Sequence, residues 1–226
     1  MVEIEPCGVQ SARHRTRATS TQMVRDIFMD GHFKLPARVL DVTFSLGRMW
    51  AWPYQAMGIQ LLSSDLNPGR HPGIQTQYVW DFRQLPASDD CYDIVVFDPP
   101  FTSAGSSDWA WGYGLDRKRG GPQNTHETGA WLLAGTREAL RVARHGLILK
   151  FKDCVESGRP TRHLDDAREI IKAAGWDIVA EYTTHGNRPQ PEGRNYTNDV
   201  QPTVYVVARE RLQGQRPRGR TYCFAN

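Results

Sequence analysis

Cysteine is scarce in this sequence, and long apolar segments are missing. The 226 residues contain four cysteines, with no CxxC pair and no histidine at ligand spacing: Cys7, Cys91, Cys154 and Cys223. This scatter favours neither a zinc site nor a disulfide framework, so we expect reduced thiols and no bound metal. No apolar run approaches the roughly 18 residues of a membrane-spanning helix, and the first residues, MVEIEPCG, do not form a basic-then-apolar signal segment. We therefore expect a cytoplasmic protein that does not bind membranes.

A strong excess of charge is also lacking. The net charge is +3 and the isoelectric point about 8.7, which permits a nucleic-acid partner without requiring one. Basic residues gather near the two ends, in ARHRTR and RLQGQRPRGR, where they form either solvated tails or phosphate-binding segments. We accordingly divide the chain into a basic arm at 1–18, one central domain at 19–210 and a basic tail at 211–226.

Apolar, strand-like segments alternate with amphipathic, helix-like segments along the central domain. The segments predicted as strands are 38–42, 59–65, 77–82, 92–98, 145–152, 176–184 and 202–210. The segments predicted as helices are 20–31, 48–58, 126–144 and 162–175. Ser20 or Thr21 is the expected N-cap of the first helix, and Pro53 interrupts the second.

This alternation predicts the fold class. Strands that read as continuous apolar runs between helices indicate a parallel sheet buried on both faces. The last two strands are not separated by a helical pattern, so one of them is expected to run antiparallel. The prediction is an α/β fold with a doubly wound, mostly parallel sheet of seven strands in a single domain. In such sheets ligands bind outside the carboxyl ends of the strands.

The glycine-rich fingerprint of a dinucleotide site is missing after the first strand. A pyrophosphate-binding loop needs G-x-G-x-x-G at a helix N-terminus, whereas the stretch LDVTFSLGR keeps Gly47 and carries Ser45. A ligand without phosphates therefore fits better. Asp65, ending the second strand, is placed to hold the two hydroxyls of a ribose, or it only begins a turn. Asp81 and Phe82, ending the third strand, are placed to contact an exocyclic amino group and a purine ring.

The fourth strand ends in a motif that core packing does not explain. In YDIVVFDPPF, the prolines lock an extended backbone without N–H donors. The carboxylate of Asp98 and the carbonyl of Pro99 then form two fixed acceptors, which match the NH2 group of a planar ring. Phe101 adds a flat apolar face on which that ring stacks. The alternative is a proline turn that merely ends a strand.

Together these stretches resemble the class I S-adenosylmethionine-dependent methyltransferases that modify exocyclic amines of nucleic-acid bases. The family's (Asn/Asp/Ser)-Pro-Pro-(Tyr/Phe/Trp) motif is matched at 98–101, and its Asp/Glu-x-(Phe/Thr)-x-Gly-x-Gly motif by DVTFSLG at 41–47, with serine in place of the first glycine. The resemblance implies that S-adenosyl-L-methionine is bound by Asp41, Thr43, Ser45, Gly47, Asp65, Asp81 and Phe82. It also implies that Asp98, Pro99, Pro100 and Phe101 form the catalytic clamp.

The resemblance implies methyl transfer to adenine N6 in DNA as the favoured reaction, because aspartate in the first clamp position occurs in adenine-N6 enzymes. Cytosine N4 stays open, and so do adenine N6 and guanine N2 in RNA. A non-catalytic nucleic-acid-binding subunit of the same fold is a further alternative. Methylation at cytosine C5 needs a cysteine nucleophile, and we exclude it because the Pro6-Cys7 pair lies in the arm.

The segment from about 102 to 125 is predicted to be a mobile substrate loop. A target base in a duplex must be flipped out of the stack, unless it is already single-stranded. Aromatic and basic side chains are assigned to nucleic-acid contacts: Trp109, Trp111, Tyr113, Arg117, Lys118 and Arg119 in the loop, and Lys150 at the end of the fifth strand. In the alternative interpretation, the tryptophans pack as a local core and the charges are solvated.

Overall fold

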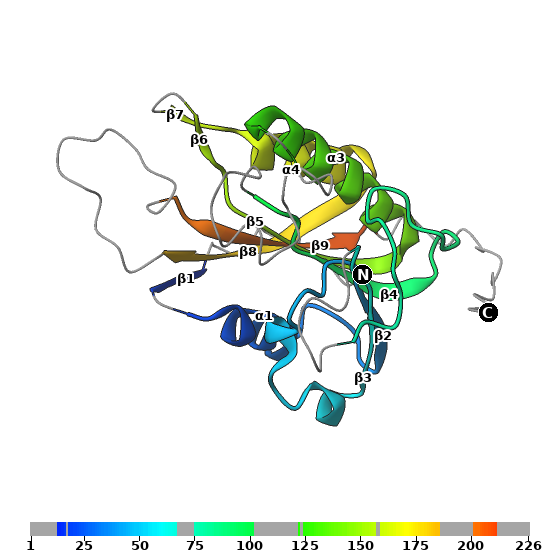
Figure 1. Cartoon of the computed structure of the whole chain (residues 1–226). Coiled ribbons are helices and arrows are strands. Elements are labelled where there is room, and N and C mark those ends of the chain that lie inside the picture. Colours follow the sequence, from blue (N-terminus) through cyan, green and yellow to red (C-terminus); the bar gives the residue numbers. More distant parts are fainter. Residues whose placement is uncertain are drawn as a thin grey trace, which may run out of the picture.

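A seven-stranded sheet lies at the centre of the protein. The computed structural model describes residues 13–16, 18–66, 75–101, 122, 124–156, 159–185 and 201–211. The strands of the sheet are β1 (Arg13–Thr16), β2 (Ala37–Asp41), β3 (Ile59–Ser63), β4 (Tyr92–Phe97), β5 (Ala143–Phe151), β8 (Trp176–His185) and β9 (Thr203–Glu210). Their spatial order is β1-β8-β9-β5-β4-β2-β3 (Figure 1). Two short strands, β6 (Val155–Glu156) and β7 (Arg159–Pro160), pair separately with each other.

Most neighbouring strands run in the same direction. The strands β3, β2, β4 and β5 are parallel, and β1 is parallel to β8. The exception is β9, which runs antiparallel to both of its neighbours, β5 and β8. The prediction that one of the last two strands is antiparallel is therefore confirmed for β9.

The seven strands are not the seven that the sequence predicts. The segment 77–82 forms no strand, and its only described pairing is an isolated bridge between Ser64 and Tyr78. Both Gln77 and Tyr78 donate their backbone N–H to the Ser63 carbonyl at 3.1 Å, so pairing does not continue along a ladder. The seventh strand is instead β1, from a segment assigned to the N-terminal arm. A short polar segment such as Arg13–Thr16 becomes a strand only because the edge of β8 offers backbone partners.

The first helix, α1 (Ser20–Met29), begins one residue earlier than expected. Its N-cap is Thr19, whose hydroxyl accepts from the Gln22 backbone N–H while the Gln22 side chain accepts from the Thr19 backbone N–H. This reciprocal arrangement is a capping box, which satisfies two otherwise unpaired donors. The apolar face of α1 buries Met23, Ile27 and Phe28.

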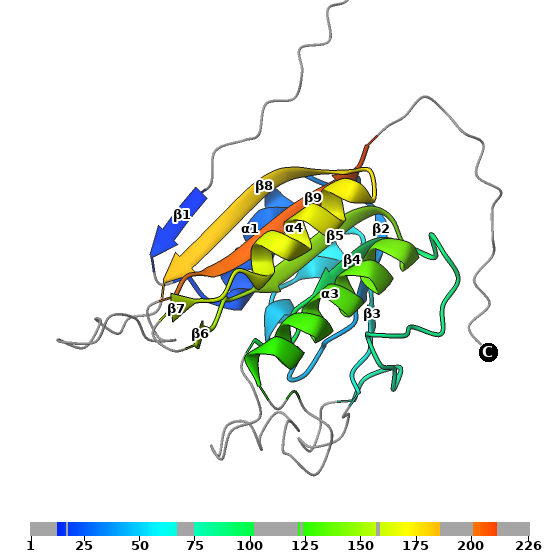
Figure 2. The same ribbon diagram turned by 90° about the horizontal axis from the view of Figure 1, so that it is seen from above.

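Helices cover both faces of the sheet. The helices α3 (Thr125–Val142) and α4 (His163–Ala173) lie on one face and α1 on the other (Figures 1 and 2). Each face has its own core cluster: Leu132, Leu164 and Ile171 belong to the one under α3 and α4, and Met23 and Ile27 belong to the one under α1. The helices predicted at 126–144 and 162–175 are confirmed as α3 and α4.

The prediction of a helix at 48–58 is wrong. Two 3-10 turns take its place, η1 (Arg48–Trp50) and η2 (Tyr54–Met57), separated around Pro53, which cannot donate a helical hydrogen bond. Three aromatic rings of this segment pack against one another instead, with centroids 5.3 to 6.4 Å apart: Trp50, Trp52 and Tyr54.

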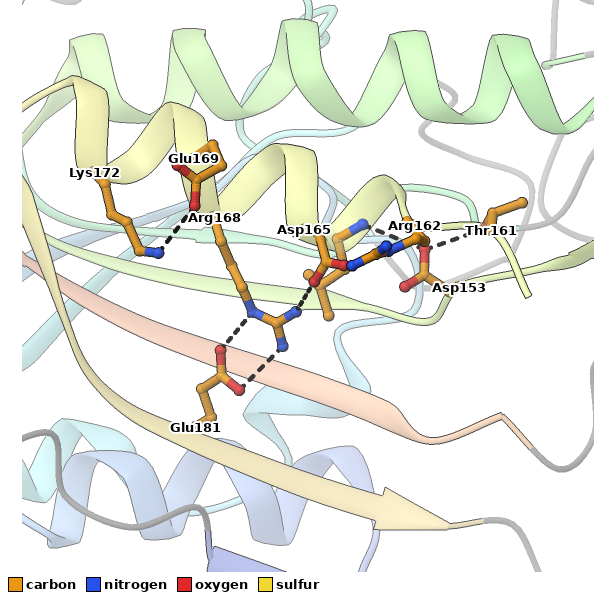
Figure 3. Close-up of polar contacts among 9 residues, drawn as sticks. Asp153, Thr161, Arg162, Asp165, Arg168, Glu169, Lys172 and Glu181 are labelled. Atoms are coloured by element: carbon orange, nitrogen blue, oxygen red, sulfur yellow. Dashed lines mark hydrogen bonds and ion pairs between the residues drawn. The ribbon is translucent and has the colours of Figure 1, made fainter. Parts of the chain in front are cut away.

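The polar face of α4 is tied to its surroundings by charge pairs (Figure 3). Arg168 donates from Nε and from Nη2 to the two carboxylate oxygens of Glu181 on β8, at 2.7 and 3.0 Å. At the start of the helix, Asp153 accepts from the hydroxyl of Thr161 and from the backbone N–H of Leu164. The bidentate pair between Arg168 and Glu181 fixes the position of α4 over the sheet.

Two cysteines within the described residues have different states. Cys154 is buried and reduced, and its thiol donates to the Phe101 carbonyl. Cys91 is disulfide-bonded. The expectation of reduced thiols is therefore wrong for Cys91, because scattered spacing in the sequence says nothing about which cysteines the fold brings together.

Candidate functional site

Three carboxylates converge where β2, β3 and β4 end. Asp41, the last residue of β2, is level with Ser63 of β3 and Val96 of β4. Asp98 follows directly after β4, and Asp65 follows β3 by two residues. The charges of Asp98 and Asp65 both act on Asp41. The parallel strands therefore gather these acidic groups at the carboxyl edge of the sheet.

Strand alternation turns one row of polar side chains toward α1. Successive side chains of a strand point to opposite faces, and the core cluster under α1 contains Val39 of β2, Val96 of β4 and Ile148 of β5. The residues two positions further along each strand therefore point to the same face. With Tyr205 of β9, which belongs to that cluster and pairs with Lys150, they form what we call the polar row: Asp41, Asp98, Lys150 and Tyr205.

Asp41 is the most deeply buried acid of the polar row, at 2 % exposure. One carboxylate oxygen accepts from the Trp50 indole N–H at 2.7 Å, and the other accepts from the Thr43 backbone N–H at 2.9 Å. Burial nevertheless raises the pKa of Asp41 to about 7, because the desolvation of the charged form outweighs these two hydrogen bonds. The negative charges of Asp98 and Asp65 act in the same direction.

The raised pKa of Asp41 predicts a protein that loses stability as the pH rises. Between its ordinary value of 3.8 and about 7, folded Asp41 holds a proton that the unfolded chain has released. We expect the free energy of unfolding to fall across this window by on the order of 4 kcal/mol from this residue. Urea unfolding from pH 4 to 8 measures it, with Asp41→Asn as the control that removes this part of the slope. An equal slope in both proteins would contradict the assignment.

The loop after β2 is shaped by hydrogen bonds to its neighbours. The hydroxyl of Thr43 accepts from the Asp98 backbone N–H at 2.7 Å, and the Ser45 backbone N–H donates to the Asp65 carboxylate at 2.8 Å. Ser45 and Gly47 both have positive φ, +49° and +63°. A Cβ on Gly47 would lie 2.7 Å from the Phe44 ring, which explains glycine there. The loop thus links the ends of all three strands.

The 98–101 segment lies beside this loop. Asp98 has a side-chain exposure of 19 % and accepts at one oxygen, Oδ2, from the Lys150 ammonium at 2.6 Å. Its other oxygen, Oδ1, is buried and has no hydrogen-bond partner within the described part of the chain. Burial raises the pKa of Asp98, and the Lys150 charge opposes that rise. Pro99 is buried, and the carbonyl of Phe101 accepts from the thiol of Cys154.

The third predicted motif lies beside the core under α3. Asp81 binds the guanidinium of its neighbour Arg83 through both oxygens, the shortest contact being 2.6 Å, and this pairing lowers the pKa of Asp81. Phe82 is 6 % exposed, with its ring centroid 5.1 Å from that of Phe97 and 6.0 Å from that of Trp131. The structure therefore places Phe82 mainly in the core.

Most predicted nucleic-acid contacts lie outside the described residues. These are Trp109, Trp111, Tyr113, Arg117, Lys118 and Arg119 of the predicted substrate loop. Lys150 is described: its ammonium lies 2.6 Å from Oδ2 of Asp98, and its side chain is 13 % exposed.

Sequence reasoning missed two members of the site. Trp50 donates to Asp41 from η1, and Tyr205 stands opposite Lys150 in the β5–β9 ladder. The sequence did contain a signal for Tyr205, because a buried tyrosine within the apolar run VYVV needs a partner for its hydroxyl. The partner is Ser20 of α1, with 3.2 Å between the two hydroxyl oxygens. For Trp50 we find no local signal.

Within the described part of the chain, histidine, cysteine, aspartate and glutamate do not form a group of three or more that suits a metal ion. The described helices include none that is long and apolar enough to cross a membrane.

Comparisons with known proteins support the fold. No protein-family model and no curated protein matches this chain. Among solved structures, the chain is similar to a candidate sarcosine dimethylglycine methyltransferase from Galdieria sulphuraria, with a TM-score of 0.53 and 12 % identity over 84 % of this chain and 85 % of that one. It is also similar to a candidate methyltransferase from Bacillus halodurans C-125, with a TM-score of 0.51 and 14 % identity over 83 % of this chain and 98 % of that one.

One structurally similar protein is named for a reaction other than methyl transfer, so similarity of fold does not identify the activity. The [4+2]-cyclase SpnF has a TM-score of 0.51 and 14 % identity, over 91 % of this chain and 89 % of that one. Similar folds host different reactions, so activity must be argued from the site. At these identities, the comparisons establish that the chain has a fold shared with solved structures of methyltransferase type.

Proposed function

We propose that this protein transfers a methyl group from S-adenosyl-L-methionine to an exocyclic amino group of a nucleic-acid base, with adenine N6 in DNA as the favoured target. One observation carries the proposal. Asp98 heads a proline-locked segment at the carboxyl edge of the sheet, and its buried Oδ1 has no hydrogen-bond partner among the residues that the structure describes. Such an atom is costly to bury, and an N–H of the target amine would satisfy it.

The charges around this atom suit the cofactor. Its sulfonium and ammonium groups are cations, and Asp41 and Asp65 place carboxylates at the same edge of the sheet. The carboxylate of Asp65 holds the Ser45 backbone N–H at 2.8 Å, and at this strand end it would also accept from ribose hydroxyls. The two methyltransferase-type neighbours with TM-scores above 0.5 lend support through the fold.

Asp81 and Phe82 are proposed to border the adenine of the cofactor. Asp81 would accept from the adenine amino group while it keeps contact with Arg83. Phe82 is 6 % exposed, so its contact with adenine would be confined to the edge of the ring. The aromatic residues Tyr78 and Trp80, stacked with centroids 4.1 Å apart, belong to the same segment of the chain.

The clamp residues account for the chemistry. The lone pair of the base amine is delocalised into the ring, which makes it a poor nucleophile. Oδ1 of Asp98 and the Pro99 carbonyl would accept its two N–H groups and favour a pyramidal nitrogen, while Phe101 holds the ring. When bound, S-adenosyl-L-methionine supplies a methyl group on a sulfonium. The clamp residues would hold and orient the amine for transfer, and this orientation would provide much of the acceleration.

Nucleoside mass spectrometry tests this function. The intact protein is expressed in a methylation-deficient host, and DNA and RNA are digested and analysed separately, with Asp98→Asn as the matched control. We expect N6-methyl-2′-deoxyadenosine to increase in DNA, dependent on Asp98. A methylated amine in RNA alone would replace DNA by RNA as the substrate. No new methylated base in either polymer, together with no cofactor binding by calorimetry, would favour the non-catalytic subunit.

A further inference from the structure

A lysine lies largely out of solvent beside the clamp, at a position where core packing does not require one. Lys150 lies near the end of β5, between the buried Leu149 and Phe151. Its side chain is 13 % exposed and its ammonium lies 2.6 Å from Oδ2 of Asp98. Lysine is rarely buried without a paired charge, and an apolar residue would continue the strand at lower desolvation cost. The position of this charge therefore calls for a functional explanation.

The ion pair uses only one oxygen of Asp98. Oδ2 accepts from Lys150, whereas Oδ1 is buried and, in the described ranges of the chain, has no hydrogen-bond partner. The Asp98 backbone is held separately, by the bond from its N–H to the Thr43 hydroxyl at 2.7 Å. The backbone N–H and Oδ2 of Asp98 are thus both held, and with respect to the described residues Oδ1 is the carboxylate oxygen without a hydrogen bond.

Lys150 is itself supported from β9. Tyr205 stands directly opposite Lys150 in the antiparallel ladder, so their side chains leave the same face of the sheet. The hydroxyl of Tyr205 is anchored to Ser20 at the start of α1, at 3.2 Å. The charge of Lys150 lowers the pKa of Tyr205 and the charge of Asp98 raises it, whereas burial is the largest cause of its raised pKa. The ion pair is therefore enclosed by groups from α1, β2, β4, β5 and β9.

We propose that Lys150 is the positioning residue of the clamp: by holding Oδ2, it keeps the Asp98 carboxylate ionised and aims Oδ1 at the substrate amine. This proposal rests on the proposed function and adds a role for a residue that the resemblance does not include. Lys150 acts through Asp98 and not on the reacting atoms. A neutral Asp98 would be a weaker acceptor and would not hold the amine in a single orientation.

The electrostatic surroundings make this role necessary. Asp41 from β2 and Tyr205 from β9 are titratable groups that face Asp98, and both disfavour negative charge near it when ionised. Asp65 adds a third carboxylate to the same edge. Burial already raises the pKa of Asp98, and Lys150 opposes that rise. Without the ammonium, the carboxyl would take up a proton at a higher pH.

The first test measures this titration without any reaction. Aspartate carboxyl carbons are labelled with 13C in the ligand-free protein, and the Asp98 signal is assigned by its loss in Asp98→Asn. We expect Asp98 to titrate at higher pH in Lys150→Met than in the wild type, and Lys150→Arg to restore the lower value. The matched control is Lys172→Met, which removes an exposed lysine of α4 paired with Glu169. Lys150→Gln repeats the test if the methionine variant does not fold.

The second test asks whether the ion pair positions the substrate. We expect Lys150→Met to lower kcat by about 10²-fold, to shift the acid limb of the kcat profile to higher pH, and to leave the KM for S-adenosyl-L-methionine nearly unchanged. Lys150→Arg should recover part of the loss. A variant that is only less stable would not combine a lower kcat with a shifted acid limb, an unchanged KM for S-adenosyl-L-methionine and recovery by arginine.

The outcomes separate this proposal from the proposed function. An Asp98 titration that is identical in wild type and Lys150→Met would overturn the proposal, even if the wild type methylates DNA. A shifted titration with unchanged kcat would also overturn it. If the wild type methylates neither DNA nor RNA, the proposed function fails, and the positioning role fails with it, although the 13C titration still shows whether the ion pair exists.

Discussion

Replacing Asp98 with alanine is expected to reduce methyl transfer by about 10³-fold, the upper range for removal of one preorganised hydrogen-bonding group. The variant loses the acceptor that faces the target amine, so kcat falls. Cofactor binding should largely persist, because the carboxylates assigned to it, Asp41 and Asp65, come from other strands. Transfer of a labelled methyl group gives the rate, and calorimetry gives the cofactor affinity.

Two controls make this result interpretable. Asp98→Ala removes the carboxylate that pairs with Lys150, so a loss of stability is expected as well; Asp98→Asn keeps a hydrogen-bond acceptor and limits that loss. Asp89→Ala, at an exposed acid paired with Arg141, controls for the substitution itself. If affinity and turnover vanish together in a variant that stays folded, Asp98 belongs to the cofactor site instead.

Replacing Asp65 with alanine is expected to weaken cofactor binding by roughly 10²-fold, the loss of two hydrogen bonds to a charged acceptor. Asp65 is proposed to hold the ribose hydroxyls, and its Oδ2 also accepts from the Ser45 backbone N–H at 2.8 Å. The substitution therefore removes a ligand contact and releases the loop after β2. At saturating cofactor, turnover should approach the wild-type value.

Calorimetric titration with S-adenosyl-L-methionine measures this change directly. Asp65→Asn is the informative partner variant, because its amide keeps one acceptor and should lose less affinity than alanine. Equal dissociation constants for wild type and Asp65→Ala would remove the ribose assignment. A variant with normal affinity but low turnover would move Asp65 from the cofactor to the substrate side of the site.

The substitutions of Asp98 and Asp65 separate the two roles proposed for the acids at the carboxyl edge of the sheet, substrate activation and cofactor binding. Asp98 is expected to act on the rate and Asp65 on the affinity, while Asp41 acts on pH-dependent stability through its raised pKa. Three acids at one sheet edge would otherwise be difficult to tell apart, since each influences the charge of its neighbours. Measuring rate, affinity and unfolding on the same variants distinguishes them.

Much of the fold was predictable because its signals are local. Apolar runs such as YDIVVF at Tyr92–Phe97 indicate a buried strand by their composition, and the periodicity of His163–Ala173 indicates a helix. Where local signals conflicted, prediction failed. Pro53 and the aromatic residues beside it replaced a helix by two 3-10 turns, and the apolar segment 77–82 made a single bridge where a strand was expected.

The sequence by itself determined the strand ends and the chemistry they carry: an aspartate after each of two parallel strands and a proline-locked acceptor after a third. Only the tertiary structure decided that Lys150 meets Asp98, 52 positions away, that Tyr205 stands opposite Lys150, and that Arg13–Thr16 joins the sheet. The physical reason is that strand composition and proline geometry act within a few residues. Partners across a sheet depend on strand order and register, which emerge only when the whole core packs.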